Sequence, residues 1–122
     1  MMGAYLRGTL VLFKALNKGA ALVFLIDLEV SDDEVVSFMS KPAYTSFTTA
    51  SFALKADALF LPYFSMRNPD GESFCVEIGA AIAHTDAVTM TKEATKSLEQ
   101  RITADPGNWF WIHRRWKHKP TV

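Results

Sequence analysis

The residues best suited to chemistry gather near the C-terminus, in the segment that runs from Asn108 to Lys119. This segment holds all three tryptophans, two of the three histidines and four of the thirteen lysines and arginines. From His113 onward the cations come without a carboxylate, so the tail is locally basic. Indole rings with polar edges beside cations suit a boundary between an apolar phase and negative charge. An RNA-stacking platform and a purely structural packing of the tryptophans are the competing interpretations.

The histidines are weak candidates for catalysis or metal binding. His84 and Asp86 form the closest histidine–carboxylate pair, but such a pair in a loop before a helix is more often a cap or a turn. His113 and His118 are five residues apart, a spacing that does not place both on one helical face for zinc. The single cysteine, Cys75, excludes an intrachain disulfide and a cysteine-cluster metal site. The sequence also lacks glycine-rich phosphate loops and Gly-x-Ser-x-Gly elbows, so we expect no metal and no cofactor.

Asp27 and Arg67 are better placed to bind a ligand. Asp27 lies at the C-terminal end of a continuous apolar run, and open α/β sheets bind ligands at that end of their strands. Arg67 follows a second apolar run and comes just before a turn. The alternatives are a solvated strand end for Asp27 and an ordinary surface arginine for Arg67.

The first half of the chain predicts a helix and two strands. Apolar residues recur at helical spacing over Tyr5–Asn17, and Gly19 follows as a natural C-cap. The continuous apolar run Ala20–Leu28 is typical of a strand covered on both faces in a parallel sheet. Val35–Phe38 predicts a short strand that Lys41-Pro42 would close.

The second half predicts a helix, a hairpin and a longer helix. Its expected elements are a helix over Thr45–Ala56, a strand over Ala58–Met66, a turn at Asn68-Pro69-Asp70-Gly71, a hairpin arm over Ser73–Ile78 and a helix over Thr89–Ala104. Pro62 cannot donate to a strand ladder, so it belongs at an edge or a bulge. In the last helix Arg101 lies near Leu98 and Ile102 on the apolar face. Together these elements predict an α/β fold with a mixed sheet flanked by helices.

Composition limits the partners of the chain. At 122 residues, with 49% apolar and 21% charged residues, it is expected to form a single folded domain. Thirteen basic and thirteen acidic residues cancel, so no overall field attracts nucleic acid or a membrane. The longest uncharged apolar run, from Gly19 to Ile26, is far shorter than the roughly 20 residues of a membrane-spanning helix.

The tail carries a specific resemblance. The order Pro-x-x-Trp-x-Trp-x-His-Arg-Arg-Trp-Lys, which begins at Pro106 and ends at Lys117, closely resembles the C-terminal signature of the bacterial lipid A biosynthesis acyltransferases. Upstream, residues 35–45 resemble the block Phe-Val-x-Phe-Phe-Gly-x-Pro-Ala-x-Thr of that family. Residues 53–67 resemble a second block that ends in arginine before an Asp-Gly turn, and residues 98–102 resemble the segment leading into the signature. The similarity therefore covers nearly the whole chain.

The resemblance implies transfer of a fatty acyl group, usually from acyl carrier protein, to a hydroxyl of a lipid A precursor. It implies that residues 1–122 form one partial domain, the C-terminal half of a glycerolipid-acyltransferase-like fold, with the signature at 106–119. Asp27 and Arg67 match family positions, and with Arg114, Arg115 and Lys117 they are the expected substrate-binding residues. The implied location is peripheral, on the cytoplasmic face of the inner membrane, with anionic lipid head groups as partners and no nucleic acid.

The chain departs from the family at the catalytic motif, His-x-x-x-x-Asp/Glu, in which the histidine acts as general base. The residue five positions after His84 is Thr89, and the residue five after His113 is His118, so the motif is absent and no catalytic residue is assigned. We therefore expect a fragment that is inactive alone and that pairs with a missing N-terminal half or with itself. The alternative hypothesis is a non-catalytic, membrane-peripheral lipid-binding or interaction module.

Overall fold

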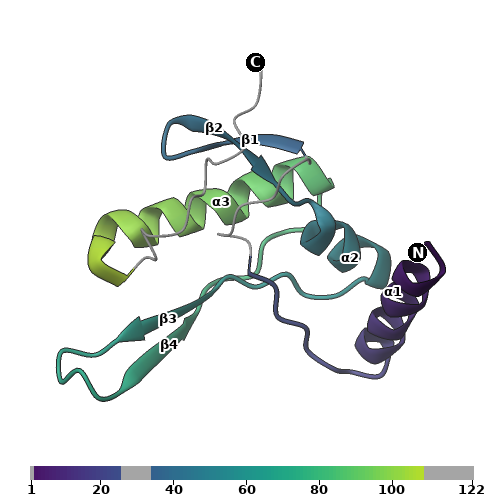
Figure 1. The fold of residues 1–122 in the computed structure, drawn as a ribbon, viewed down its shortest axis with the longest axis horizontal. Coiled ribbons are helices and arrows are strands. Elements are labelled where there is room, and N and C mark those ends of the chain that lie inside the picture. Colours follow the sequence, from purple (N-terminus) through teal and green to yellow (C-terminus); the bar gives the residue numbers. More distant parts are fainter. Residues whose placement is uncertain (1, 26–33, 109–122) are drawn as a thin grey trace.

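The computed structural model describes residues 2–25 and 34–108, which contain helices, two hairpins and a short 3-10 turn (Figure 1). The elements, in chain order, are α1 (Met2–Asn17), β1 (Glu34–Phe38), β2 (Lys41–Thr45), α2 (Thr48–Ala56), β3 (Tyr63–Arg67), β4 (Phe74–Ile78), α3 (Ala87–Ala104) and η1 (Pro106–Asn108). The prediction of a fold that mixes helices and strands is confirmed. Within the described ranges, however, the strands form two separate antiparallel pairs, β1–β2 and β3–β4, in place of one mixed sheet.

Helix α3 lies at the centre of the arrangement (Figure 1). The β1–β2 hairpin packs along one side of it, α2 packs near its beginning, and the β3–β4 hairpin projects from the region below it. Helix α1 lies at the far end of the molecule, where it contacts α2. The elements are therefore arranged around one long helix and not around a sheet.

Two buried clusters hold these elements to α3. Met90 and Ala94 of α3 pack with Ala50 and Ala53 of α2 and with Ile82 from the loop before α3. Further along the same helix, a second cluster joins Ile102 to Phe38 of β1 and Ala43 of β2. Phe38 and Met90 are at most 1% exposed, so water is excluded from both clusters.

The predicted strand over Ala20–Leu28 is wrong for its described part. Residues 20–25 form no strand, and Val23 and Leu25 are 70% and 72% exposed. A strand buried on both faces needs hydrogen-bonded neighbours, and neither described sheet pairs with this segment. Its alternate residues Leu22 and Phe24 instead lean toward α2 as part of a groove wall.

The boundary predicted at Lys41-Pro42 is also wrong, because these residues begin β2. The β1–β2 connection is the two-residue turn Met39-Ser40, whose φ angles are 51° and 66°. Positive φ at both central residues matches the twist of a tight hairpin, but it is unusual without glycine or asparagine. The backbone N–H of Met39 donates to the Glu99 carboxylate of α3 at 2.8 Å, which holds the turn in place.

The remaining helix and hairpin predictions are confirmed with small shifts. Helix α1 ends in a Schellman motif, since Ala20 N–H donates to Ala15 C=O and Gly19 N–H to Leu16 C=O, with Gly19 at φ 90°. The strand predicted from Ala58 begins only at Tyr63, directly after Pro62, which cannot donate to a ladder. The predicted hairpin pairs β3 with β4 over the register Tyr63↔Ile78 to Arg67↔Phe74.

Two aspartates shape the local structure through hydrogen bonds. The backbone N–H of Thr89, and then its hydroxyl, donate to Asp86 at the N-cap of α3 and lower the pKa of that carboxyl. In the β3–β4 turn, the backbone N–H of Glu72 and the hydroxyl and N–H of Ser73 donate to Asp70 and lower its pKa. Both carboxylates are therefore stabilised in the folded state.

We predict that these two carboxylates make the chain less stable in acid. Because their folded pKa values lie below the ordinary 3.8, their contribution is present above about pH 4 and is lost as pH falls through the folded values. Urea unfolding between pH 7 and pH 3 should therefore show a shallower loss of stability below about pH 4 in the variant Asp70→Asn/Asp86→Asn than in the parent chain.

The variant Glu72→Gln is the matched control, because it removes a carboxylate from the same turn while its backbone N–H still donates to Asp70. It distinguishes the effect on stability of losing a negative charge from the effect of losing the two hydrogen-bonded carboxylates. An equal slope below pH 4 in the double variant and the parent chain would contradict the prediction.

Candidate functional site

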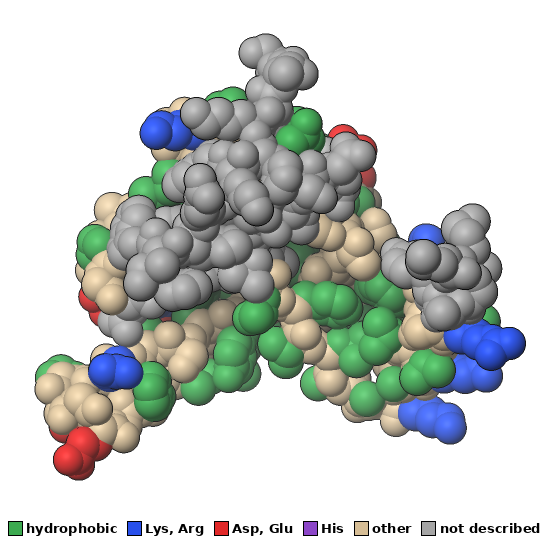
Figure 2. Space-filling view, viewed as in Figure 1, with side chains coloured by type: hydrophobic (Ala, Val, Ile, Leu, Met, Phe, Trp, Pro, Cys, Tyr) green, Lys and Arg blue, Asp and Glu red, His purple; other side chains and the backbone are tan. Residues whose placement is uncertain are grey.

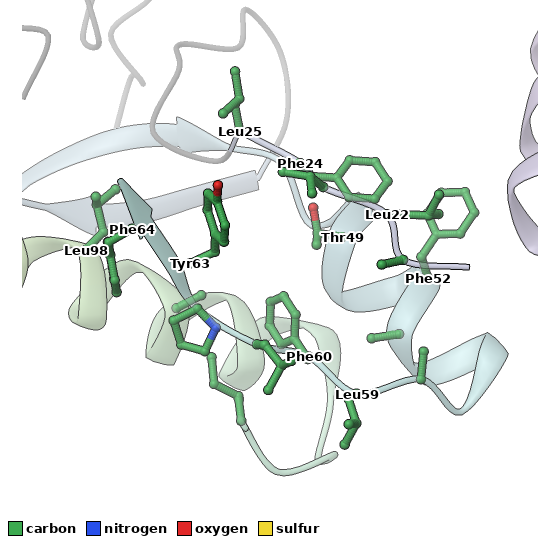
Figure 3. Close-up of a pocket in the computed structure, with 18 of the residues that line it drawn as sticks. Leu22, Phe24, Leu25, Thr49, Phe52, Leu59, Phe60, Tyr63, Phe64 and Leu98 are labelled. Atoms are coloured by element: carbon green, nitrogen blue, oxygen red, sulfur yellow. The ribbon is translucent and has the colours of Figure 1, made fainter. Parts of the chain in front are cut away.

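The main hollow of the described structure is an apolar groove of about 740 Å³. Figure 3 shows its walls, which come from the segment after α1, from α2, from the segment that leads into β3, and from α3. Its volume is within the range of about 300–1,000 Å³ typical of small-molecule sites. The groove is therefore large enough to hold an organic ligand.

Aromatic and aliphatic side chains line most of the groove. The labelled liners that carry this character are Leu22, Phe24, Leu25, Phe52, Leu59, Phe60, Tyr63, Phe64 and Leu98. The ring of Phe52 lies 4.6 Å from that of Phe13 and 5.9 Å from that of Phe24, so α1, α2 and the segment between α1 and β1 meet there. Leu59, also a liner, is 78% exposed. The groove is thus an open apolar trough and not a sealed cavity.

Arg101 is the cation that lines this groove among the described residues. Its guanidinium forms an ion pair with Glu77 of β4 and lies 5.1 Å from the centre of the Phe64 ring. A further Arg101 N–H points to the sulfur of Met66 at 3.7 Å. These contacts tie α3 to the β3–β4 hairpin, and through Arg101 they bring a charged pair to a mostly apolar trough.

The lining of the groove is therefore best suited to an aliphatic chain. Its few polar liners are Thr49, Tyr63, Ser65, Arg101 and Asp105, and none of them forms a nucleophile–base pair with a histidine in the described residues. An alkyl chain needs no hydrogen-bond partner and gains from every apolar surface that it covers. The described liners thus form an apolar trough, and no arrangement for proton transfer is visible among them.

Arg67, the described member of the predicted binding residues, does not line the groove. It ends β3, its side chain is exposed, and its guanidinium lies 5.6 Å from the centre of the Phe74 ring across the hairpin. The contact is a cation–π interaction at an exposed site. Arg67 therefore lies on the β3–β4 hairpin and is not one of the groove liners.

The pair His84 and Asp86 does not form a catalytic arrangement. His84 Nε2 donates to the carbonyl oxygen of Ala58 at 2.7 Å, and its Nδ1 lies 3.7 Å from Asp57. Asp86 instead caps α3 through both of its oxygens. The interpretation of Asp86 as a cap is confirmed, and His84 fixes the loop before β3 against the loop before α3.

Four of the predicted binding residues, Asp27, Arg114, Arg115 and Lys117, lie outside the described residues. The same holds for most of the aromatic-basic tail. Within residues 2–25 and 34–108, no three His, Cys, Asp or Glu side chains come together as a metal site would require. In these same ranges no helix is both long enough and apolar enough to cross a bilayer.

The sequence patterns did not predict the groove or the Arg101–Glu77 pair. Arg101 gave a usable signal, because it is a cation on the apolar face of a helix that also carries Leu98 and Ile102. A cation in that position needs a partner on the neighbouring element, which here is Glu77. The groove gave no such signal, since its walls come from segments that are far apart in the sequence.

Comparison with known proteins extends these observations. The sequence profile of a family described as "Bacterial lipid A biosynthesis acyltransferase" matches residues 7–118. A lipid A biosynthesis acyltransferase of Haemophilus influenzae is 30% identical over 90 residues, which cover 70% of this chain. A lipid A biosynthesis lauroyltransferase of Escherichia coli is 28% identical over 115 residues, which cover 89% of this chain. The matched regions are only 29% and 38% of the lengths of these two relatives.

Proposed function

The chain belongs to the bacterial lipid A biosynthesis acyltransferase family, and from this premise we propose that its groove holds the fatty acyl chain during transfer to a lipid A precursor. The observation that carries the proposal is the apolar trough of about 740 Å³, which is lined by Arg101, the partner of Glu77. A fatty acyl chain is the part of such a substrate that an apolar trough suits.

The energetics favour an aliphatic occupant. Each CH₂ group moved from water into an apolar site gains about 0.8 kcal/mol, so a chain of several carbons binds well without polar contacts. The same rule limits the length of the acyl chain. An alkyl group that reaches a charged pair no longer gains from apolar contact, and it would displace favourable contacts between charges. We propose that Arg101 and Glu77 form such a limit, and that the shape between them and Leu22 restricts acyl length.

The proposed reaction joins an acyl thioester to a hydroxyl. The precursor hydroxyl attacks the thioester carbonyl, the new ester C–O bond forms, the C–S bond breaks, and the thiol of acyl carrier protein leaves. A general base must take the hydroxyl proton. Since the His-x-x-x-x-Asp/Glu motif is absent from this sequence, we propose that these 122 residues supply substrate binding and that the base comes from a segment outside them. That segment would be an N-terminal half or a second chain.

Within this proposal, residues 1–122 act as one partial acyltransferase-like domain, with the signature at 106–119. Asp27 and Arg67 would bind the precursor on the acceptor side, and Arg114, Arg115 and Lys117 would bind phosphate or anionic head groups. Arginine and lysine suit this role because they make charge-assisted hydrogen bonds to phosphate. The proposed location is the cytoplasmic face of the inner membrane, where such a precursor would be reached from the surface.

We predict that lauric acid occupies the groove and that Leu22→Asp weakens its binding about tenfold. The reason is the loss of contacts worth about two CH₂ groups, roughly 1.5 kcal/mol, beside an unfavourable new charge. The measurement is the displacement of the fluorescent apolar probe N-phenyl-1-naphthylamine by lauric acid. Leu22 lies outside the helices and strands and is only partly buried, so the fold is expected to tolerate the change.

Val88→Asp is the matched control, because Val88 is 44% exposed and does not line the groove. It makes the same aliphatic-to-carboxylate change in the first turn of α3, where a negative charge is favourable. Equal weakening by the two variants, or none by either, would contradict the assignment of the groove to the acyl chain.

We also predict that the 122-residue chain alone transfers no acyl group. The assay follows labelled lauroyl groups from acyl carrier protein to a lipid A precursor, with a lauroyltransferase that contains the His-x-x-x-x-Asp/Glu motif as positive control. The expected product level equals that of the reaction without protein, because the His-x-x-x-x-Asp/Glu motif is absent from this sequence. Turnover above that background would refute the prediction and call for a different base.

A further inference from the structure

The outer side of α1 carries charge of one sign. Residues 2–25 contain Arg7, Lys14 and Lys18 and no aspartate or glutamate. The three cations are seven and four residues apart, so on a helical wheel they lie within about 40° of one another. All three side chains are exposed. The helix, with the residue that follows it, therefore presents a single positive stripe.

Two large aliphatic side chains lie on either side of this stripe. Leu10 and Val11 are 56% and 63% exposed, although they belong to a helix whose opposite side already packs on the protein. On that opposite side, Phe13 stacks near Phe52 of α2, and Leu16 lines the groove. Leu10 and Val11 are therefore not needed to hold α1 in place. Figure 2 shows cationic and hydrophobic side chains grouped at the α1 end of the molecule.

We propose that this outer face of α1, defined by Arg7, Leu10, Val11, Lys14 and Lys18, lies on the surface of an anionic lipid bilayer. A helix with cations and exposed aliphatic residues on the same side suits an interface, where the cations meet head groups and the aliphatic side chains enter the acyl boundary. The inference does not rest on the acyl groove, which lies on the other side of the helix, or on the basic tail.

A bilayer fits this face better than an acidic protein or a nucleic acid. Cations alone satisfy a phosphate backbone, and the described face has no aromatic ring on which a base could stack. Leu10 and Val11 would have no role in binding an acidic protein or a nucleic acid, whereas a bilayer would bury both side chains. The exposed side of α3 gives the contrast, since Lys92 and Lys96 alternate there with Glu93 and form an ordinary solvated surface.

The first test measures sedimentation of the 122-residue chain with vesicles of phosphatidylglycerol and phosphatidylethanolamine. We expect Lys14→Gln/Lys18→Gln to weaken partitioning about thirtyfold, since each cation near an anionic surface contributes about a fivefold gain. The matched control, Lys92→Gln/Lys96→Gln, removes the same charge from α3 and should change partitioning by less than about threefold. Equal effects of the two variants would overturn the proposal.

The second test locates the contact, and it stands even if one charge variant folds poorly. The exposed Cys75 is replaced by serine, and an environment-sensitive nitrobenzoxadiazole label is attached to Val11→Cys or, as control, to Lys96→Cys. On addition of the anionic vesicles, the emission at position 11 should shift to shorter wavelength, while position 96 should not change. No shift at position 11, or the same shift at both positions, would overturn the proposal.

A third variant, Arg114→Ala/Arg115→Ala/Lys117→Ala, separates α1 from the tail. The proposal requires that the label at position 11 still shifts in this background. Loss of the shift there, with α1 intact, would assign membrane binding to the tail alone and overturn the proposal. The same label can be measured with an acidic protein or with single-stranded DNA. A larger emission shift at position 11 with either of these than with vesicles would likewise reject a lipid partner.

Discussion

The burial of one stripe along α3 is the constraint on which the rest of the structure depends. Met90 and Ala94 close against α2, and Ile102, about two turns further along, closes against Phe38 of the β1–β2 hairpin. The small side chains of Ala50 and Ala94 let α2 and α3 approach closely. Between these contacts Arg101 reaches sideways to Glu77 and fixes the β3–β4 hairpin. Helix α3 thus positions α2 and the β3–β4 hairpin, and residues of α2, β3 and α3 line the groove.

Local signals in the sequence predicted the elements that need no distant partner. The helical spacing of α1, α2 and α3, the C-cap at Gly19 and the turn at Asp70 all depend on nearby residues, and all are present. The Met39-Ser40 turn was missed because nothing in those two residue types favours positive φ. Its stability depends on Glu99, sixty residues away, whose carboxylate accepts from Met39 N–H. A contact of that separation leaves no mark in a local pattern.

The apolar run after α1 shows why the site itself was harder to predict than the fold. A buried strand and a groove wall have the same composition, and only the presence of partner strands distinguishes them. Here residues 20–25 have none among the described sheets, and they line the groove although Val23 is 70% exposed. Family resemblance identified the family correctly, whereas Arg101, the cation that lines the groove among the described residues, was not among the predicted binding residues.

The two proposed lipid contacts meet on one helix. Phe13 and Leu16 face the protein and the groove, whereas Leu10 and Val11 face outward beside the cations. If α1 lies on a bilayer, an acyl chain is separated from the groove by the width of one helix, about 10 Å. That distance is short compared with an extended acyl chain. An open trough such as this one then has a physical advantage over a sealed cavity, because the chain can enter from the side while its polar end stays at the surface. Acyl-chain binding would use the groove side of α1 and membrane contact its outer side, so the two proposed contacts draw on different residues of the same helix.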